Sequence, residues 1–334
     1  MTHPFAATLL QWYDQYGRDL PWRATRDPYA IWLSEVILQQ TRIEQGLPYW
    51  ERFMQQFPTV EALSAASEDE VLRLWQGLGY YSRARNLHTA AKQVEQLGQF
   101  PSSLDGIKSL KGVGDYTAAA IASMAFDIPV AVVDGNVYRV LARHYGIDTP
   151  INTTEGKHTF TALAQELLPP EHAAAFNQAM MDFGATWCTP KSPRCSECPL
   201  ADTCQALHDD SIDKLPAKLK KLKVKTRHFQ YIYISCNRFT AMRRRPAGDI
   251  WQGLWEPLLI EDTALPQFDG TLTKLRTDVK HVLTHRIIIA DFYRLDCDTR
   301  PHLPAEYLWI AENDIDRYAI PRLVEILLQS IKHN

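Results

Sequence analysis

The sequence predicts a two-domain chain in which an all-α domain precedes a smaller α+β domain. Its 334 residues are more than one hydrophobic core usually serves, so two cores are expected. Apolar residues recur with helical spacing through residues 1–207, whereas runs of β-branched and aromatic residues appear only later. Between these halves lie four cysteines: Cys188, Cys195, Cys198 and Cys204.

The helical half contains several amphipathic segments separated by turns rich in Gly and Pro. The strongest segment runs from Tyr29 to about Gln45 and places Glu35 beside Ile31 and Leu38. Further helices are expected at residues 51–56, 68–75, 81–97, 116–126, 137–145 and 154–167. In the second half, strands are expected at 229–234 and 286–293 and a final helix at 320–331.

A basic stretch separates the two predicted domains, with seven basic residues and no acidic one from Lys214 to Arg227. It fits a solvated linker or a strap across a polyanion. We therefore expect domains at 1–210 and 228–334, joined by a linker at 211–227. Composition is ordinary, with 46% hydrophobic residues and a net charge of −3, and no apolar run is long enough for a membrane helix. A cytoplasmic protein is expected, with Cys236 and Cys297 as reduced core residues.

The four clustered cysteines follow the spacing C-x6-C-x2-C-x5-C, with Pro199 after the third. Two disulfides are disfavoured in a cytoplasmic chain. Structural zinc usually uses paired CxxC knuckles or CxxC with histidines, whereas one CxxC with wide, unequal gaps favours a [4Fe–4S] cluster. The spacing leaves zinc open.

Three further features point to chemistry. The glycines of Gly112-Val113-Gly114 fit either an ordinary turn or a helix–hairpin–helix turn whose N–H groups bind a phosphate. Asp134 fits a helix N-cap, and the same position suits it to face a developing positive charge. Glu35 is either a solvated glutamate or, if half-buried, a general acid with a raised pKa. Nothing in the spacing shows that Glu35 and Asp134 meet.

Five linked stretches resemble the MutY-type adenine DNA glycosylases. They are the segments at 28–41 (PYAIWLSEVILQQT), 77–87 (GLGYYSRARNL), 110–116 (LKGVGDY) and 133–137 (VDGNV), and the cysteine cluster. Essentially all of residues 5–205 are covered, in order. The resemblance implies a helix–hairpin–helix glycosylase domain of the endonuclease III superfamily, with a structural [4Fe–4S] cluster on the four cysteines.

The resemblance also implies how the residues divide the chemistry. Glu35 is expected to protonate a flipped adenine and Asp134 to stabilise the resulting oxocarbenium ion, supported by Tyr116 and Asn136. Arg23 and Gln178 match positions that line the adenine pocket. The lyase branch of the superfamily has a lysine where this chain has Tyr116, so a monofunctional glycosylase is expected.

The expected partner is double-stranded DNA with adenine opposite 8-oxoguanine or guanine, bound by a monomer and without a membrane. The residues that match the family's wedge and hairpin contacts are Gln40, Thr41, Leu78, Tyr80, Gly112 and Gly114.

The C-terminal domain resembles the family's Nudix-like module more loosely. The stretch 251–256 (WQGLWE) fits the module's opening loop, but no acidic metal-binding box follows it, so recognition of 8-oxoguanine is expected rather than nucleotide hydrolysis. The recognition loop, often Phe-Ser-His, is Leu283-Thr284-His285 here. Thr284 and His285 keep polar groups for the lesion, whereas Leu283 loses an aromatic ring.

Two other readings stay open. An endonuclease III-like glycosylase–lyase for oxidised pyrimidines is disfavoured by Tyr116 and by the additional domain. A non-catalytic DNA clamp is disfavoured because both Glu35 and Asp134 are present.

Overall fold

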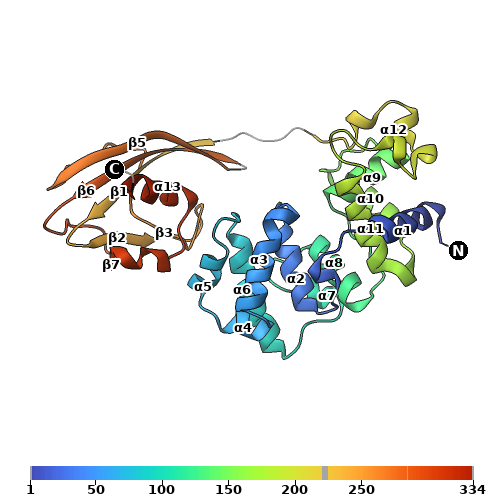
Figure 1. Cartoon of the computed structure of the whole chain (residues 1–334), viewed down its shortest axis with the longest axis horizontal. Coiled ribbons are helices and arrows are strands. Elements are labelled where there is room, and N and C mark those ends of the chain that lie inside the picture. The colour runs from blue at the N-terminus through green and yellow to red at the C-terminus, as the bar shows by residue number, and fades with distance from the viewer. Residues whose placement is uncertain (1, 220–224, 284, 333–334) are drawn as a thin grey trace. The chain divides into compact units, whose positions relative to one another are not determined.

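A computed structural model describes residues 2–219, 225–283 and 285–332, drawn as ribbons in Figure 1. The chain packs into two compact units. One comprises Met1–Ser64 and Thr89–Lys220, and the other comprises Ala65–His88 and Lys221–Asn334.

The described part of the first unit is built from helices and short 3-10 turns. Its α-helices are α1 (Pro4–Tyr16), α2 (Pro28–Leu38), α3 (Ile43–Gln56), most of α4 (Val60–Ala65), the second half of α6 (Ser82–Leu97), α7 (Leu104–Lys108), α8 (Asp115–Phe126), α9 (Gly135–Tyr145), α10 (Thr154–Leu167), α11 (Ala173–Thr186) and α12 (Gln205–His208). Its 3-10 turns are η1 (Pro21–Arg23), η2 (Pro170–His172), η3 (Cys195–Glu197), η4 (Ala201–Thr203) and η5 (Ile212–Lys214).

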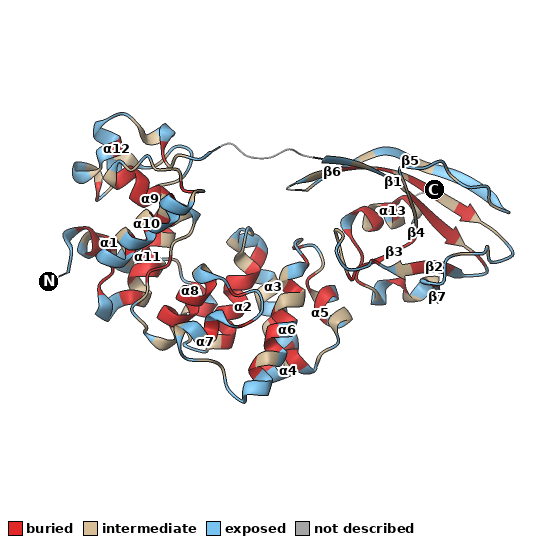
Figure 2. Ribbon diagram, turned by 180° about the vertical axis from the view of Figure 1, so that it is seen from behind, coloured by how far each residue is buried: buried red, intermediate tan, exposed pale blue. Residues whose placement is uncertain are grey.

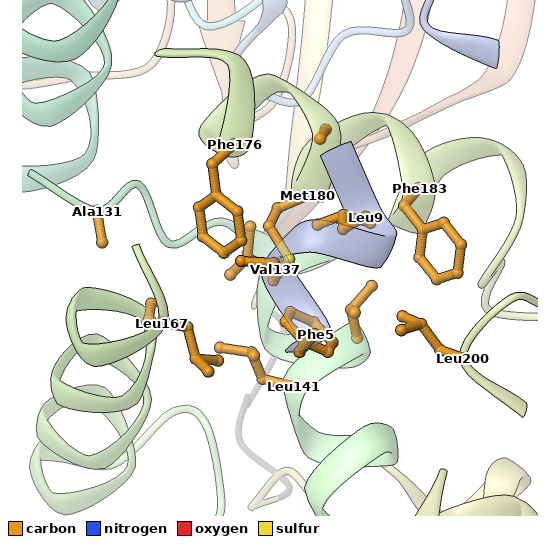
Figure 3. Packing of buried hydrophobic residues seen from close by; sticks show 14 of the residues in the cluster. Phe5, Leu9, Ala131, Val137, Leu141, Leu167, Phe176, Met180, Phe183 and Leu200 are labelled. Carbon is orange, nitrogen blue, oxygen red and sulfur yellow. The ribbon is translucent and has the colours of Figure 1, made fainter. Parts of the chain in front are cut away.

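A core of large apolar side chains joins α1, α9 and α11. Phe5 from α1, Val137 and Leu141 from α9, and Phe176 and Met180 from α11 belong to one buried cluster, shown in Figure 3. Burying such side chains stabilises each by about 1.5–3 kcal/mol. This core fixes α9, whose N-terminus carries Asp134, against the helix that carries Gln178.

The predicted continuous helix from Tyr29 to about Gln45 is wrong. Helix α2 ends at Leu38, and α3 begins at Ile43. Between them Gln40 adopts a left-handed conformation with φ 58°, which interrupts the helical hydrogen-bond ladder. The break lets α3 fold back onto α2, so closely that a Cβ on Gly46 would lie 2.6 Å from Leu38 Cδ2. Helix α2 itself is buried along nearly its whole length (Figure 2).

The second unit contains two sheets. Its elements are α5 (Glu68–Leu74), the first half of α6, β1 (Lys225–Ser235), β2 (Phe239–Arg244), β3 (Trp255–Glu256), β4 (Leu258–Glu261), β5 (Thr271–Val282), β6 (Arg286–Asp296), β7 (Tyr307–Ala311), η6 (Glu312–Arg317) and α13 (Arg322–Lys332). The sheets have the strand orders β4-β1-β6-β5 and β3-β2-β7.

The longer sheet has β1 and β6 at its centre. They pair in parallel from Lys225↔Arg286 to Ser235↔Asp296. Phe229, Tyr231 and Phe292 point from these strands into a core that also buries Leu323 and Leu327 of α13. The predicted strands at 229–234 and 286–293 and the final helix are thus confirmed, with β1 and β6 longer than expected. No helix among the described residues is long and apolar enough to cross a membrane.

Candidate active site

Asp134 lies at the N-cap of α9. Its carboxylate accepts hydrogen bonds from the backbone N–H groups of Asn136 and Val137, both at 2.8 Å, and from the Asn136 side-chain amide at 2.8 Å. Burial raises the pKa of Asp134 above its usual value, although these hydrogen bonds and Arg139 oppose that shift. The N-cap interpretation is therefore confirmed, and the cap fixes the orientation of this carboxylate.

Glu35 is buried in α2, with 8% of its surface exposed. Burial raises the pKa of this carboxyl group to about 7, a hydrogen bond from the Tyr116 hydroxyl opposes the shift, and the Asp134 carboxylate adds to it. Arg23 also opposes the shift. A carboxyl group with this pKa carries a proton near neutral pH and can donate it.

The structure brings Glu35 and Asp134 together, which the sequence could not show. With Tyr116 they line two adjoining cavities of about 420 Å³ and 740 Å³. The smaller cavity also contains the predicted residues Arg23, Thr41, Asn136 and Gln178. The larger contains the predicted residues Gln40, Gly112 and Gly114. Segments from five parts of the chain thus converge on one pair of carboxyl groups.

The smaller cavity rests on a buried ion network that the sequence analysis missed. Asp182 of α11 is fully buried and accepts two hydrogen bonds from the Arg23 guanidinium, each at 2.7 Å. Arg18 also donates to it, from its backbone N–H at 2.9 Å and from Nε at 2.8 Å. Burial would raise the pKa of Asp182, but these arginines lower it below its usual value. The sequence offered one signal for Asp182: it lies four residues after Gln178, about one helical turn, and so on the same face of the helix.

A hydrogen bond from a neighbouring tyrosine orients Gln178, which lines the smaller cavity. The Tyr13 hydroxyl donates to Gln178 Oε1 at 2.6 Å. This orients the Nε2 amide of Gln178 so that it can donate to a ligand in the cavity. Arg23 and Gln178 therefore present oriented donors on the wall beside Glu35.

The glycine-rich turn connects α7 to α8. Gly112 has φ 78°, a left-handed conformation that glycine adopts without strain. Gly114 is the N-cap of α8, and no atom lies within 4 Å of where its Cβ would be. Among the described residues no side chain caps this end of α8, so its first N–H groups can serve an anion, as a site at a helix N-terminus requires.

The four cysteines form a loop after α11 and are free, half-buried thiols. Burial raises the pKa of Cys198 to about 11, and the charges of the other three cysteines add to the shift. A bound metal centre would stabilise such thiols as thiolates. Among the described residues, no three His, Cys, Asp or Glu side chains form a group that could hold a single metal ion. A four-iron cluster instead takes four separate thiolates, which this loop supplies.

Two arginines of α9 tie this loop to Asp134, a connection that the sequence analysis also missed. Arg139 donates to the Cys188 carbonyl at 2.7 Å and to the Asn136 side-chain oxygen at 2.8 Å. Asn136 in turn donates to Asp134 at 2.8 Å. One turn later, Arg143 donates to the Thr189 carbonyl at 2.8 Å and lies 3.5 Å from Cys188 Sγ. The orientation of Asp134 is thereby linked to the fold of the cysteine loop.

The second unit contains a separate pocket of about 650 Å³. Leu78, Tyr80 and His285, all predicted DNA contacts, line it together with Trp251 and His281. Leu78 is buried, whereas Tyr80 is about half exposed. The remaining predicted residue, Thr284, lies outside the described residues.

Three family models match the chain. They describe an HhH-GPD superfamily base excision DNA repair protein at residues 33–170, an iron–sulfur binding domain of endonuclease III at 188–204 and a NUDIX domain at 230–330. The second match resolves the choice between zinc and iron, and the cofactor is a [4Fe–4S] cluster. The third agrees with the predicted Nudix-like domain.

Similar proteins are found among curated sequences. The chain is 34% identical to an adenine DNA glycosylase of Buchnera aphidicola (subspecies Baizongia pistaciae) over 293 residues, which are 84% of this chain and 83% of that protein. It is 47% identical to the adenine DNA glycosylase of Mus musculus over 213 residues, which are 60% of this chain and 41% of that protein. The chain therefore spans less than half of the mouse protein.

Solved structures resemble the helical part. A thermostable thymine-DNA glycosylase is 31% identical with a TM-score of 0.57, covering 61% of this chain and 95% of that one. Endonuclease III, trapped as a covalent DNA intermediate, has a TM-score of 0.54 at 22% identity over 61% of this chain and 94% of its own, and shares the fold.

Proposed function

Because the chain belongs to the adenine DNA glycosylases, hydrolases of N-glycosyl bonds in base excision repair, we propose that it excises adenine mispaired with 8-oxoguanine or guanine. The observation that carries this proposal is the pair of carboxyl groups, buried Glu35 and half-buried Asp134, that line one cavity. Adenine reaches such a cavity only when its nucleotide is flipped out of the duplex.

Glu35 is the general acid in the proposed reaction. Its pKa of about 7 keeps a substantial fraction protonated at neutral pH, so it can donate a proton to the N7 atom of adenine. Protonation makes adenine a neutral leaving group, and the N-glycosyl bond then breaks toward an oxocarbenium ion. The Tyr116 hydroxyl, hydrogen-bonded to Glu35, orients the acid.

Asp134 stabilises the cation that forms on the sugar. Its orientation is fixed by the α9 N-terminus and by Asn136, so little reorganisation is needed when charge develops. Water then attacks the sugar, which completes a hydrolysis with two carboxyl groups in separate roles. Arg23 and Gln178 recognise the adenine edge, with Arg23 positioned by Asp182.

The surrounding residues suit double-stranded DNA. The open N-terminus of α8 after Gly112 and Gly114 binds a backbone phosphate. Gln40 lines the larger cavity and Thr41 the smaller, where they can contact the flipped nucleotide's neighbours. Half-exposed Tyr80, backed by buried Leu78, enters the base stack. The pocket of the second unit that contains His285 receives the 8-oxoguanine.

The [4Fe–4S] cluster, when bound, cross-links the loop after α11. Cys188, Cys195, Cys198 and Cys204 would hold it. The chain's own contribution is the link through Arg139, which keeps Asn136 and Asp134 oriented.

One duplex assay tests the proposal. A duplex with adenine opposite 8-oxoguanine is incubated with the protein under single-turnover conditions, with and without alkali. Because Tyr116 replaces the lyase lysine, we expect strand breaks only after alkali. Glu35→Gln should slow excision by about 10²–10⁴-fold. Excision at the normal rate by Glu35→Gln would refute the general acid, and alkali-independent cleavage at oxidised pyrimidines would favour the lyase reading.

A further inference from the structure

Two cysteines outside the cluster loop lie side by side in the second unit. Strands β1 and β6 pair in parallel up to Ser235↔Asp296, and Cys236 and Cys297 are the next residue of each chain segment. The ladder continues there, since the Cys297 N–H donates to the Ser235 carbonyl at 3.1 Å. The expectation that both are reduced core residues thus misses their proximity, which sixty intervening residues conceal in the sequence.

The geometry of this pair suits a covalent bond. Neighbouring strands lie about 4.8 Å apart, within the range of about 4.4–6.8 Å that disulfides require between Cα atoms. The Cys297 thiol lies 3.9 Å from the Ser235 carbonyl oxygen of the neighbouring strand, and the Cys236 thiol is close enough to raise the pKa of Cys297. We propose that Cys236 and Cys297 form a reversible disulfide, a modification site that takes small disulfides such as glutathione disulfide as its oxidant.

The backbone around the pair is fixed on both sides. Cys236 exchanges two hydrogen bonds of 2.9 Å with Phe239 across the tight turn between β1 and β2. In that turn, the Asn237 side-chain amide donates to the Asp298 carbonyl at 2.9 Å, which ties the turn to the residue after Cys297. Bond formation therefore needs side-chain rotation and no movement of the strands.

The two thiols differ in exposure, and this difference determines which of them reacts first with an oxidant. Cys236 is fully buried, whereas Cys297 is half-buried and lines a surface hollow of about 690 Å³ with Ser235 and Asp298. Burial and the neighbouring Cys236 raise the pKa of Cys297 to about 11, so few thiolates exist at neutral pH and oxidation is slow. A slow reaction fits a pair that stays reduced until oxidising conditions persist.

The proposed reaction is two thiol–disulfide exchanges. The Cys297 thiolate attacks one sulfur of glutathione disulfide, breaks its S–S bond and releases one glutathione, which takes up the proton that Cys297 lost. The Cys236 thiol then loses its proton, attacks the Cys297 sulfur and releases the second glutathione. The protein loses two electrons and two protons, and one glutathione disulfide becomes two glutathiones.

Peptide mapping of the full-length holoprotein tests the proposal. The protein is equilibrated in glutathione buffers of increasing oxidised fraction, quenched with acid, alkylated under denaturing conditions and digested. We expect a peptide pair joined through Cys236 and Cys297, lighter by two hydrogen atoms, whose fraction rises with the oxidised fraction and reverts on adding reduced glutathione. The cluster cysteines are on other peptides and do not confuse this readout.

Matched variants separate the two cysteines. Cys236→Ser should stop the reaction at a glutathione adduct on Cys297, while Cys297→Ser should leave Cys236 unmodified because it is buried. The wild-type map alone decides the case if a variant fails to fold. No linked peptide at any buffer composition, or linkage of either cysteine only to the cluster cysteines, would overturn the proposal. It depends on the second unit's geometry and not on adenine excision.

Discussion

Glu35 and Asp134 carry the same carboxyl group in different surroundings. Burial raises the pKa of both, but three hydrogen bonds from the α9 N-terminus oppose that shift at Asp134. At Glu35, in the middle of a helix whose backbone N–H groups are used by the helix itself, Tyr116 and Arg23 oppose the shift and the Asp134 charge adds to it. When two environments push the pKa values of two carboxyl groups apart, one site can provide both a protonated acid and a carboxylate anion.

The protonation of Glu35 predicts a pH dependence of excision. If Glu35 is the acid, the single-turnover rate on an adenine:8-oxoguanine duplex should fall as pH rises through about 7, approaching a tenfold decrease per pH unit above it. Rates measured from pH 5.5 to 9 with saturating enzyme check this. A rate that stays level to pH 9 would contradict the assignment of Glu35.

Burial of the Glu35 carboxyl group should lower the free energy of unfolding at high pH. Its pKa is about 7 when folded and about 4.5 when unfolded, so the unfolded state loses the proton first as pH rises. The free energy of unfolding is therefore unaffected by Glu35 below about pH 4.5 and is lowered by about 3 kcal/mol by pH 8. We expect Glu35→Gln to raise the melting temperature by about 4–8 °C at pH 8 and hardly at all at pH 5.

An exposed glutamate provides the control for that melting experiment. Glu51→Gln on α3 removes the same charge from a solvated position and should leave the melting temperature within about 1 °C at both pH values. An equal rise in both variants would mean that net charge, and not burial of Glu35, determines the effect.

At the scale of elements, the sequence predicts helices well where one face is apolar. Helix α10 and helix α13 match their predicted ranges to within two residues. Helix α11 was missed because buried residues lie on most of its faces, which removes the amphipathic contrast. The break at Gln39–Arg42 was missed because it contains no Gly or Pro, and only the packing of α3 against α2 requires it.

Helix α9 connects the cysteine loop to Asp134, which predicts an effect of Arg139. Arg139→Gln removes hydrogen bonds to the Cys188 carbonyl and to Asn136, so the Asn136 side chain that donates to Asp134 is held less firmly. We expect excision to slow by about tenfold or more while the affinity for the duplex stays within about twofold. Single-turnover rates and equilibrium binding measure the two quantities.

A surface arginine makes the matched control for Arg139. Arg26 forms an exposed ion pair with Asp127, and Arg26→Gln should change neither quantity. Iron content must also be measured, because Arg139→Gln protein that has lost its cluster would show a defect in the loop itself. A variant with full iron content and wild-type rate would contradict the coupling of Arg139 to Asp134.

The turn before α8 permits a paired prediction. Gly112→Ala places a side chain at φ 78° and should destabilise the first unit by about 1 kcal/mol. Gly114 has φ −93°, which alanine adopts freely, and its Cβ would project into open space. Gly114→Ala should therefore keep the melting temperature and still weaken duplex binding, because the methyl group occupies the phosphate position. Unchanged binding by Gly114→Ala would argue against phosphate binding at this turn.

At the scale of the whole molecule, the candidate site could be predicted only in part. The resemblance supplied Glu35, Asp134 and their neighbours, but no local pattern showed that α2 and the start of α9 meet across one cavity. Asp182 and Arg139 were missed because each acts through another side chain, and such roles depend on tertiary contacts. The net charge of −3 likewise gives no sign of DNA binding, because the proposed phosphate contact at the α8 N-terminus needs no net positive charge.

Preference for one partner base over another is a difference between two binding free energies, so it can change while catalysis does not. His285 is exposed and lines the pocket of the second unit, whereas both carboxyl groups belong to the first unit. We expect His285→Ala to weaken binding of an adenine:8-oxoguanine duplex by about 3–10-fold, the value of one hydrogen bond, and to leave binding of an adenine:guanine duplex unchanged. His302→Ala, an exposed histidine that does not line the pocket, is the control. Equal weakening on both duplexes would mean that His285 contacts the backbone and reads no lesion.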